Sequence, residues 1–167
     1  MPTLSPEVLG RLYRQHAPAL RLYARQWPGG EDAVHDAFVK LAQQSPAPEQ
    51  VLPWLYRVVR NEALTAQRTA ARRRRREGAA SAPEAWFAAA DDWLDARDAA
   101  RRLAELPLEL REVIVARLWG GLTFEAVAQL VGCSLPTAHR RYQAGLAELR
   151  ERLTGPWTPT PPARTTT

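Results

Sequence analysis

The sequence predicts an all-α protein made of two small helical domains joined by a short linker. Apolar residues recur at helical spacing through residues 6–76 and again through residues 97–153. Neither stretch shows the alternation of apolar and polar residues that a half-buried strand requires. Between them lies a linker, residues 77–96, and residues 77 to about 90 of it shift to small side chains. A chain of 167 residues is long enough for two such domains.

The N-terminal domain, residues 6–76, is expected to begin with a long amphipathic helix. Its apolar stripe consists of Val8, Leu9, Leu12, Tyr13, Leu20, Tyr23 and Trp27. Pro18 lies inside this stretch and should bend or interrupt the helix, because proline lacks the backbone N–H that an interior turn uses. The run Pro28-Gly29-Gly30 ends the helix.

Two further helices complete this domain. The first opens at Glu31 and Asp32, since acidic residues favour the positive end of a helix. Residues 43–53, with three prolines, form a loop, and a third helix runs from Trp54 into a run of five arginines at residues 72–76. The inward-facing residues of the two helices are Val34, Ala37, Phe38 and Leu41, then Leu55, Val58, Val59 and Leu64.

A helix is expected over residues 91–105, which leads from the linker into the C-terminal domain, residues 97–153. Its apolar positions are Trp93, Leu94, Ala100 and Leu103. A second helix begins near Pro107 and Glu109 and ends at Gly120-Gly121. Its apolar positions are Leu110, Val113, Ile114 and Leu118.

A short helix and a basic helix follow, separated by a tight turn. Thr123 can cap the short helix, Gly132 permits the turn, and Ser134 can cap the basic helix. The basic helix carries a polar cluster in its N-terminal half, where recognition helices meet base edges: Thr137, His139, Arg140, Arg141 and Gln143. The plainer interpretation is three amphipathic helices with a solvated basic face. Because the short helix, glycine turn and capped basic helix occur together, a DNA-binding helix-turn-helix is favoured.

Composition narrows the function classes. The formal net charge of +5 suits a polyanionic partner. Cys133 is the sole cysteine, which excludes an internal disulfide or a zinc site built on cysteines. No apolar run approaches the length of a membrane span and the N-terminus lacks a signal-peptide pattern, so we expect a cytoplasmic protein. The proline- and threonine-rich segment 154–167 is expected to be a disordered tail, and Trp86 and Phe87 in the linker can dock on a neighbouring surface.

Three segments, taken in order, resemble the extracytoplasmic-function group of bacterial sigma-70 factors. They are EDAVHDAFVKLA, PWLYRVVRNEALTAQRTAARRRRR and LPLELREVIVARLWGGLTFEAVAQLVG. The resemblance covers roughly residues 8–76 and 97–153. It implies a non-enzymatic specificity subunit of RNA polymerase, with region 2 followed by region 4. Such a protein binds core polymerase and promoter DNA, helps to melt the duplex and needs no cofactor. The resemblance also leads us to expect an anti-sigma factor as regulator and a monomer when free.

By the same resemblance, the second helix docks on the largest polymerase subunit. Its polar side carries Glu31, Asp32, His35, Asp36 and Lys40, which can make the polar contacts that set register. The alternative is a solvated helix face. The family commonly has glutamine where this chain has His35.

The third helix and the loop before it would read the melted −10 element. Gln50 and Asn61 are the candidate base readers, and Arg57, Arg60 and Arg68 are candidates for the DNA backbone. Tyr56 can stack on a base or be a part-buried packing residue. In the arginine run at residues 72–76, Arg72 and Arg73 are the candidates for neutralising DNA phosphates. The alternative is that the run only places favourable positive charge at the C-terminal end of the helix. The loop is shorter than in many members and lacks the usual phenylalanine before Trp54, which leaves base preference open.

The recognition helix would enter the major groove of the −35 element. Family positions for base or backbone contact fall on His139, Arg140, Gln143 and Ala144, while Thr137 and Arg141 would touch phosphates. His139 and Ala144 stand where arginine or lysine is common in the family, so −35 binding should be weaker or of different sequence.

Two other functions remain open at this stage. The chain can be a free-standing helix-turn-helix regulator, although it shows no heptad seam for dimerisation and such a protein has no use for the acidic second helix. It can also be a sigma-like protein that sequesters a partner.

Overall fold

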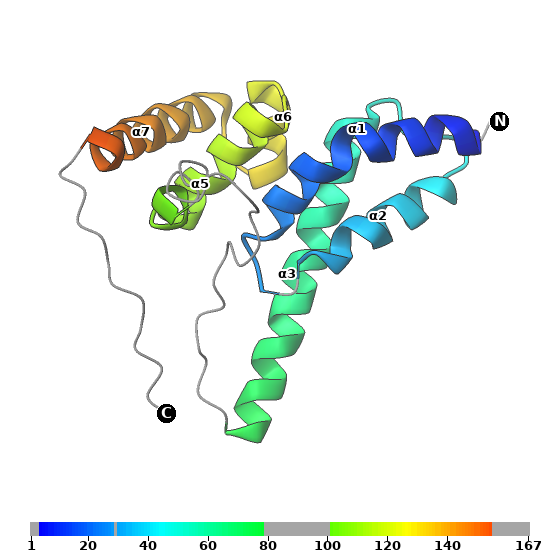
Figure 1. Ribbon diagram of the computed structural model, residues 1–167, viewed down its shortest axis with the longest axis horizontal. Helices are drawn as coiled ribbons and strands as arrows, with labels where there is room; N and C mark the ends of the chain where they lie inside the picture. The colour runs from blue at the N-terminus through cyan, green and yellow to red at the C-terminus, as the bar shows by residue number, and fades with distance from the viewer. Residues whose placement is uncertain (1–3, 29, 79–100, 155–167) are drawn as a thin grey trace, which may run out of the picture.

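The computed structural model describes residues 4–28, 30–78 and 101–154, and within these ranges the chain is helical with no strand (Figure 1). The prediction of an all-α protein with two small helical domains is confirmed. The helices are α1 (Pro6–Ala24), α2 (Asp32–Ala42), α3 (Val51–Glu77), α5 (Leu108–Ile114), η1 (Val115–Trp119), α6 (Phe124–Val131) and α7 (Leu135–Thr154).

Helix α1 begins where Ser5 caps it, its hydroxyl accepting the N–H of Val8 at 3.4 Å. Pro18 does not interrupt the helix, which continues to Ala24. Leu20 and Tyr23, which follow the proline, are fully buried. Their burial outweighs the one backbone hydrogen bond that Pro18 cannot make.

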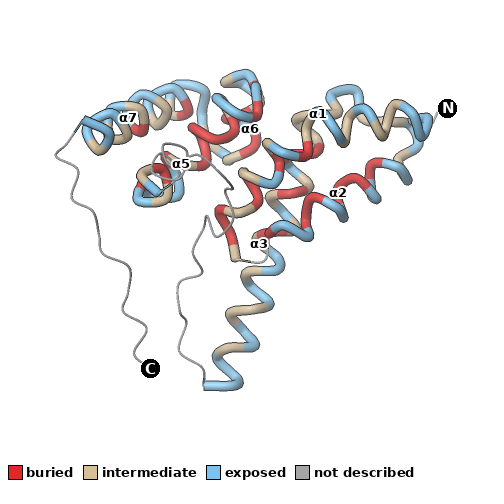
Figure 2. Tube along the Cα trace, viewed as in Figure 1, coloured by how far each residue is buried: buried red, intermediate tan, exposed pale blue. Residues whose placement is uncertain are grey.

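Helices α1, α2 and α3 pack against one another, and the predicted inward face of α2 is buried as expected. Helix α3 begins three residues earlier than predicted, because Pro53 falls in its first turn, where its missing N–H costs nothing. It ends at Gly78, which adopts the left-handed conformation with φ 64°. The C-terminal half of α3 extends beyond α1 and α2 and is exposed or half-buried (Figures 1 and 2).

The three predicted features of the helix-turn-helix are confirmed. The hydroxyl of Thr123 accepts the N–H of Ala126 at 3.2 Å, capping α6. Gly132 has φ 70° and turns the chain after α6. Ser134 accepts the N–H of Thr137 at 3.3 Å, capping α7. Of the helix expected over residues 91–105, residues 101–104 are helical; its first part, the linker with Trp86 and Phe87, and residues 155–167 lie outside the described residues.

One feature of this domain was not predicted. The helix that starts at Leu108 widens into a π-helical turn at η1, and the N–H of Gly120 reaches the carbonyl of Val115 at 3.0 Å. The wider turn shifts the side chains that follow out of the α-helical register. Leu118, predicted to be buried by its spacing, is therefore 51% exposed.

The buried residues of the two domains form one continuous core. Tyr23, Trp27 and Tyr56 contribute the largest N-terminal side chains, and Ile114 and Val115 lie on the C-terminal side. Helix α1 contacts η1, and α3 contacts α6. Figure 2 places buried positions of α1 and α3 toward the α5–α6 side of the molecule. In the described part of the chain, no helix is long and apolar enough to cross a membrane.

Candidate functional site

The predicted polar face of α2 lies on the surface, opposite the buried face formed by Val34 and Leu41. All its members are exposed: Glu31, Asp32, His35, Asp36 and Lys40. Glu31 pairs with Arg25 at the start of the helix, and Lys40 pairs with Glu62 of α3. These residues therefore form one surface that a partner can reach.

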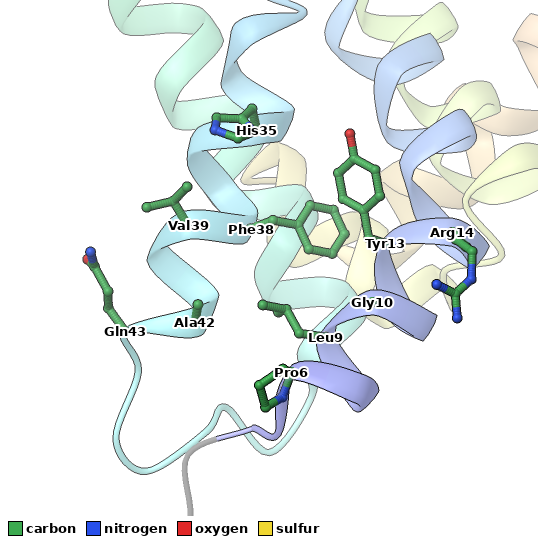
Figure 3. Close-up of a pocket in the computed structure, with 10 residues that line it drawn as sticks. All are labelled: Pro6, Leu9, Gly10, Tyr13, Arg14, His35, Phe38, Val39, Ala42 and Gln43. Atoms are coloured by element: carbon green, nitrogen blue, oxygen red, sulfur yellow. The ribbon is translucent and has the colours of Figure 1, made fainter.

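This α2 surface borders two hollows of different chemistry. Asp32 and Asp36 line a polar hollow of about 460 Å³ between α2 and α3, together with Glu62 and Arg73. His35 lies on the other side, in a mainly apolar hollow of about 650 Å³ between α1 and α2. Figure 3 shows His35 above Phe38 and Val39 and facing Tyr13 across this hollow.

Most of the α3 residues predicted for the −10 element lie on the surface. Gln50 precedes the helix, and Arg57, Asn61 and Arg68 follow along its exposed side. In the arginine run, Arg72 and Arg73 are exposed, and Arg73 pairs with Glu77 at 2.9 Å. The exposed C-terminal half of α3 thus presents a row of cations.

Tyr56 is placed differently from its neighbours. Its side chain is fully buried, with its ring edge-on to Tyr23 at 4.9 Å between centroids. Its hydroxyl has no hydrogen-bond partner among the described residues, and burial raises the pKa of Tyr56 well above the ordinary tyrosine value. Of the two roles considered for Tyr56, this conformation gives it packing, because no base can reach the ring.

The side chain of Arg60 is also partly buried, because it pairs with a residue of the other domain. Its Nε donates to the carboxylate of Glu112 at 2.5 Å, and its side chain is 25% exposed. Glu112 belongs to α5 and is 4% exposed, and the same carboxylate oxygen accepts a hydrogen bond from the Tyr23 hydroxyl at 2.5 Å. The ion pair therefore joins the two domains.

The electrostatics of this cluster follow from burial and from the shared carboxylate. Burial would lower the pKa of Arg60, but the hydrogen bond and charge of Glu112 outweigh it, so the net shift is upward. Burial, then the negative charge of Glu112, raise the pKa of Tyr23. Arg60 stays charged and Tyr23 stays protonated, which is the arrangement that the hydrogen bonds require.

The α7 residues predicted to recognise the −35 element differ in exposure and in their contacts. His139, Arg140 and Gln143 are exposed. Arg141 is half-buried and pairs with Glu109 of α5 at 3.1 Å, and the Thr137 hydroxyl is bonded to Ser134 and Arg140. The structure thus brings all five predicted residues to one end of α7. Three of them, Thr137, Arg140 and Arg141, also make polar contacts within the protein there.

His139 is held by an aromatic contact that the sequence analysis missed. Its imidazole stacks on Phe124 of α6, with centroids 3.8 Å apart and planes 29° from parallel. The guanidinium of Arg117 lies 4.9 Å from the centroid of the same phenyl ring. Phe124 lies in the first turn of α6, outside the buried face formed by Val127, Ala128 and Leu130. An aromatic residue outside the apolar face was the only sequence signal for this contact.

The hydrogen bond between Glu112 and Tyr23, which links the two domains, was also not predicted. Glu112 stood out as a carboxylate between the apolar positions Leu110 and Val113, and it was the one signal that a buried partner exists. Tyr23 was assigned to the core, which is correct, but its hydroxyl partner lies 89 positions away and leaves no local pattern.

Two family models match this chain. The sigma-70 region 2 model matches residues 12–75, and the sigma-70 region 4 model matches residues 96–149. Among solved structures, the chain is similar to the sigma factor RpoE in complex with the anti-sigma factor NepR from Bartonella quintana. The identity is 24%, the TM-score is 0.67, and the match covers 86% of this chain and 95% of that one.

A second similar structure is CnrH in complex with the cytosolic domain of CnrY, with 24% identity, a TM-score of 0.59 and 89% of each chain covered. At this identity, both structures establish a shared fold. No curated protein matches the sequence.

Proposed function

Because this chain belongs to the sigma-70 family and carries its regions 2 and 4, as the extracytoplasmic-function group does, we propose that it binds core RNA polymerase and directs it to promoters. The observation that supports the proposal most is the presence in one chain of two separate elements whose exposed cations suit DNA. A capped recognition helix lies in region 4, and a row of exposed arginines lies on α3 of region 2. A free-standing helix-turn-helix regulator uses only the first.

Region 4 is proposed to read the −35 element through α7. The exposed side chains of Arg140 and Gln143 have the donor groups that base edges in the major groove accept. His139 contributes from a fixed position, because its ring is stacked on Phe124. Thr137 and Arg141 are proposed to contact phosphates beside the groove. In the free protein they hold the end of α7 through Arg140 and Glu109.

Region 2 is proposed to hold the melted −10 element along α3. Asn61 and Gln50 are the base readers, and Arg57, Arg68 and the arginine run, with Arg72 and Arg73, neutralise phosphates. The exposed position of each supports this assignment. Tyr56 and Arg60 belong to the same helix but are covered in this conformation.

The α2 surface is proposed to bind core polymerase. Its carboxylates stand clear of the core, and Asp32 and Asp36 border a polar hollow that suits a basic side chain. An anti-sigma factor is proposed as a further partner, because the similar structures of RpoE and CnrH are complexes with NepR and CnrY. The protein itself performs no catalysis in this scheme, and RNA synthesis belongs to the polymerase.

The test is complex formation with purified bacterial core polymerase, followed by run-off transcription from a genomic promoter library. Asp36→Arg reverses one charge at the centre of the α2 surface and is expected to abolish polymerase binding, while circular dichroism stays helical. Gln15→Arg, an equally exposed site on α1, is the matched control and should bind as the wild type does.

Three outcomes separate the candidate functions. Complex formation with initiation at defined start sites supports the proposal. Complex formation without initiation indicates a sequestering protein. Specific duplex binding without any polymerase complex indicates a free-standing regulator.

A further inference from the structure

The strongest unassigned feature is the polar cluster buried between the two domains. A carboxylate from region 4, Glu112, accepts hydrogen bonds from two region 2 side chains, Tyr23 and Arg60, each at 2.5 Å. Glu112 and Tyr23 are almost fully excluded from solvent. A carboxylate loses much of its hydration on burial, so it is stable there only with such partners. The cluster therefore exists only while the domains are packed together.

The packing around this cluster is close. A Cβ atom added at Gly120, where the chain leaves η1, would lie 2.6 Å from the hydroxyl oxygen of Tyr56. Region 4 thus covers the very part of α3 that holds Tyr56 and Arg60. The next residues predicted to contact DNA along the helix, Arg57, Asn61 and Arg68, stay exposed.

We propose that the Glu112–Arg60–Tyr23 cluster is an intramolecular latch, in which region 4 supplies an anion in place of DNA and hides Arg60 and Tyr56 from the −10 strand. An arginine binds a carboxylate and a phosphate with the same donors, so Glu112 and a DNA phosphate compete for Arg60. The DNA part of this inference rests on the proposed function, whereas the latch itself rests on the contacts alone.

One feature of the closed latch, the buried hydroxyl of Tyr56, favours separation of the domains. The Tyr56 hydroxyl is buried without a partner among the described residues, and an unsatisfied buried hydroxyl favours exposure to water. Opening gives that hydroxyl solvent, frees Arg60 for a phosphate and uncovers the Tyr56 ring for stacking on a base. A single domain movement therefore completes the −10 surface, which ties reading of that element to separation of the domains.

The direct test measures the distance between the domains in the full chain. Spin labels are placed at two exposed sites, Gln15→Cys on α1 and Glu151→Cys on α7, after Cys133→Ser removes the native thiol. The unaltered latch is expected to give one narrow distance distribution. Glu112→Gln keeps the shape of the side chain but removes the charge that holds Arg60, and is expected to broaden the distribution toward longer distances.

The matched control is Glu105→Gln, because Glu105 also pairs with an arginine but within region 4, at 3.6 Å from Arg152. It should keep the narrow distribution. Tyr23→Phe, which removes one hydrogen bond and no charge, should give an intermediate distribution. A broad distribution in the unaltered latch, or an unchanged narrow one in Glu112→Gln with normal helical content, overturns the latch.

A second measurement tests the role of Arg60. Binding of a fluorescent single-stranded dT 20-mer is expected to tighten about tenfold in Glu112→Gln. The gain should vanish in the double variant Glu112→Gln/Arg60→Ala, and a gain that survives there overturns competition for Arg60. If the distances lengthen but no polymerase complex forms, the latch stands and the proposed function fails.

Discussion

The two helices proposed to contact DNA, α7 and α3, differ in how far their proposed contact residues are exposed. On α7 of region 4, the side chains proposed to read bases, His139, Arg140 and Gln143, are exposed. On α3 of region 2, the exposed cations continue along the helix, but Tyr56 and Arg60 are covered by region 4 itself. In this conformation the residues proposed to read the −35 element are therefore exposed, whereas part of the proposed −10 surface is covered. If both proposals hold, we expect region 4 to bind duplex DNA before region 2 can hold a melted strand.

The largest expected effect is on DNA binding by α7, whose proposed base readers are exposed. Arg140→Ala should weaken binding to −35 duplexes by ~1–3 kcal/mol and change their order of preference, because a side chain that reads a base edge is lost. Arg150→Ala, exposed at the far end of the same helix, is the matched control and should leave the order unchanged. Titration of a duplex library with each variant makes the comparison. Equal affinity of wild type and Arg140→Ala for every duplex would remove Arg140 from base reading.

The buried cluster that joins the two domains, to which Tyr23 of α1 belongs, should respond to alkaline pH. The folded protein raises the pKa of Tyr23 through burial and then through Glu112, so its folded state holds this proton more tightly than the unfolded chain does. The associated stability is complete below the ordinary tyrosine pKa of 10.0 and falls as pH rises beyond it.

Between the ordinary pKa and the raised pKa of Tyr23, its ionisation should lower the free energy of unfolding by ~1.4 kcal/mol per pH unit. Unfolding in urea at pH 8 and at pH 11 measures the slope. Tyr23→Phe removes the titrating group and should make the slope shallower, even though it also lowers stability at pH 8. An identical slope in both proteins would mean that Tyr23 is accessible to solvent.

How far the sequence predicts this molecule depends on the range of the interactions involved. Caps and turns were predictable, because Thr123, Gly132 and Ser134 act within three or four residues of themselves. The same local rules misjudged Pro18 and Leu118, where burial and a π-helical turn override helical spacing. Exposed members of the proposed site follow from periodicity, since charged side chains on α2 and α3 face away from the apolar stripes.

Contacts between the domains could not be predicted in this way. The family resemblance predicts a DNA contact for Arg60. No pattern near Arg60 in the sequence indicates that it pairs with Glu112, 52 residues away. Gly145 is similar: its neighbours in space are Ile114 and Leu110 of α5, so the missing side chain serves packing inside region 4. Pairs like these are fixed by the tertiary arrangement, and one sequence contains no record of which residues meet.

The smallest expected effect concerns how α7 aims a side chain. Phe124→Leu removes the ring on which His139 stacks and should reduce discrimination between −35 duplexes by ~0.5–1.5 kcal/mol, the usual contribution of an aromatic pair. Binding to non-specific duplex should hardly change, because phosphate contacts do not depend on His139. Phe124→Tyr keeps the ring and should restore discrimination, which separates positioning of His139 from general packing. If Phe124→Leu and wild type rank the duplexes identically, His139 does not read bases. Base reading by region 4 would then depend on Arg140 and Gln143 alone.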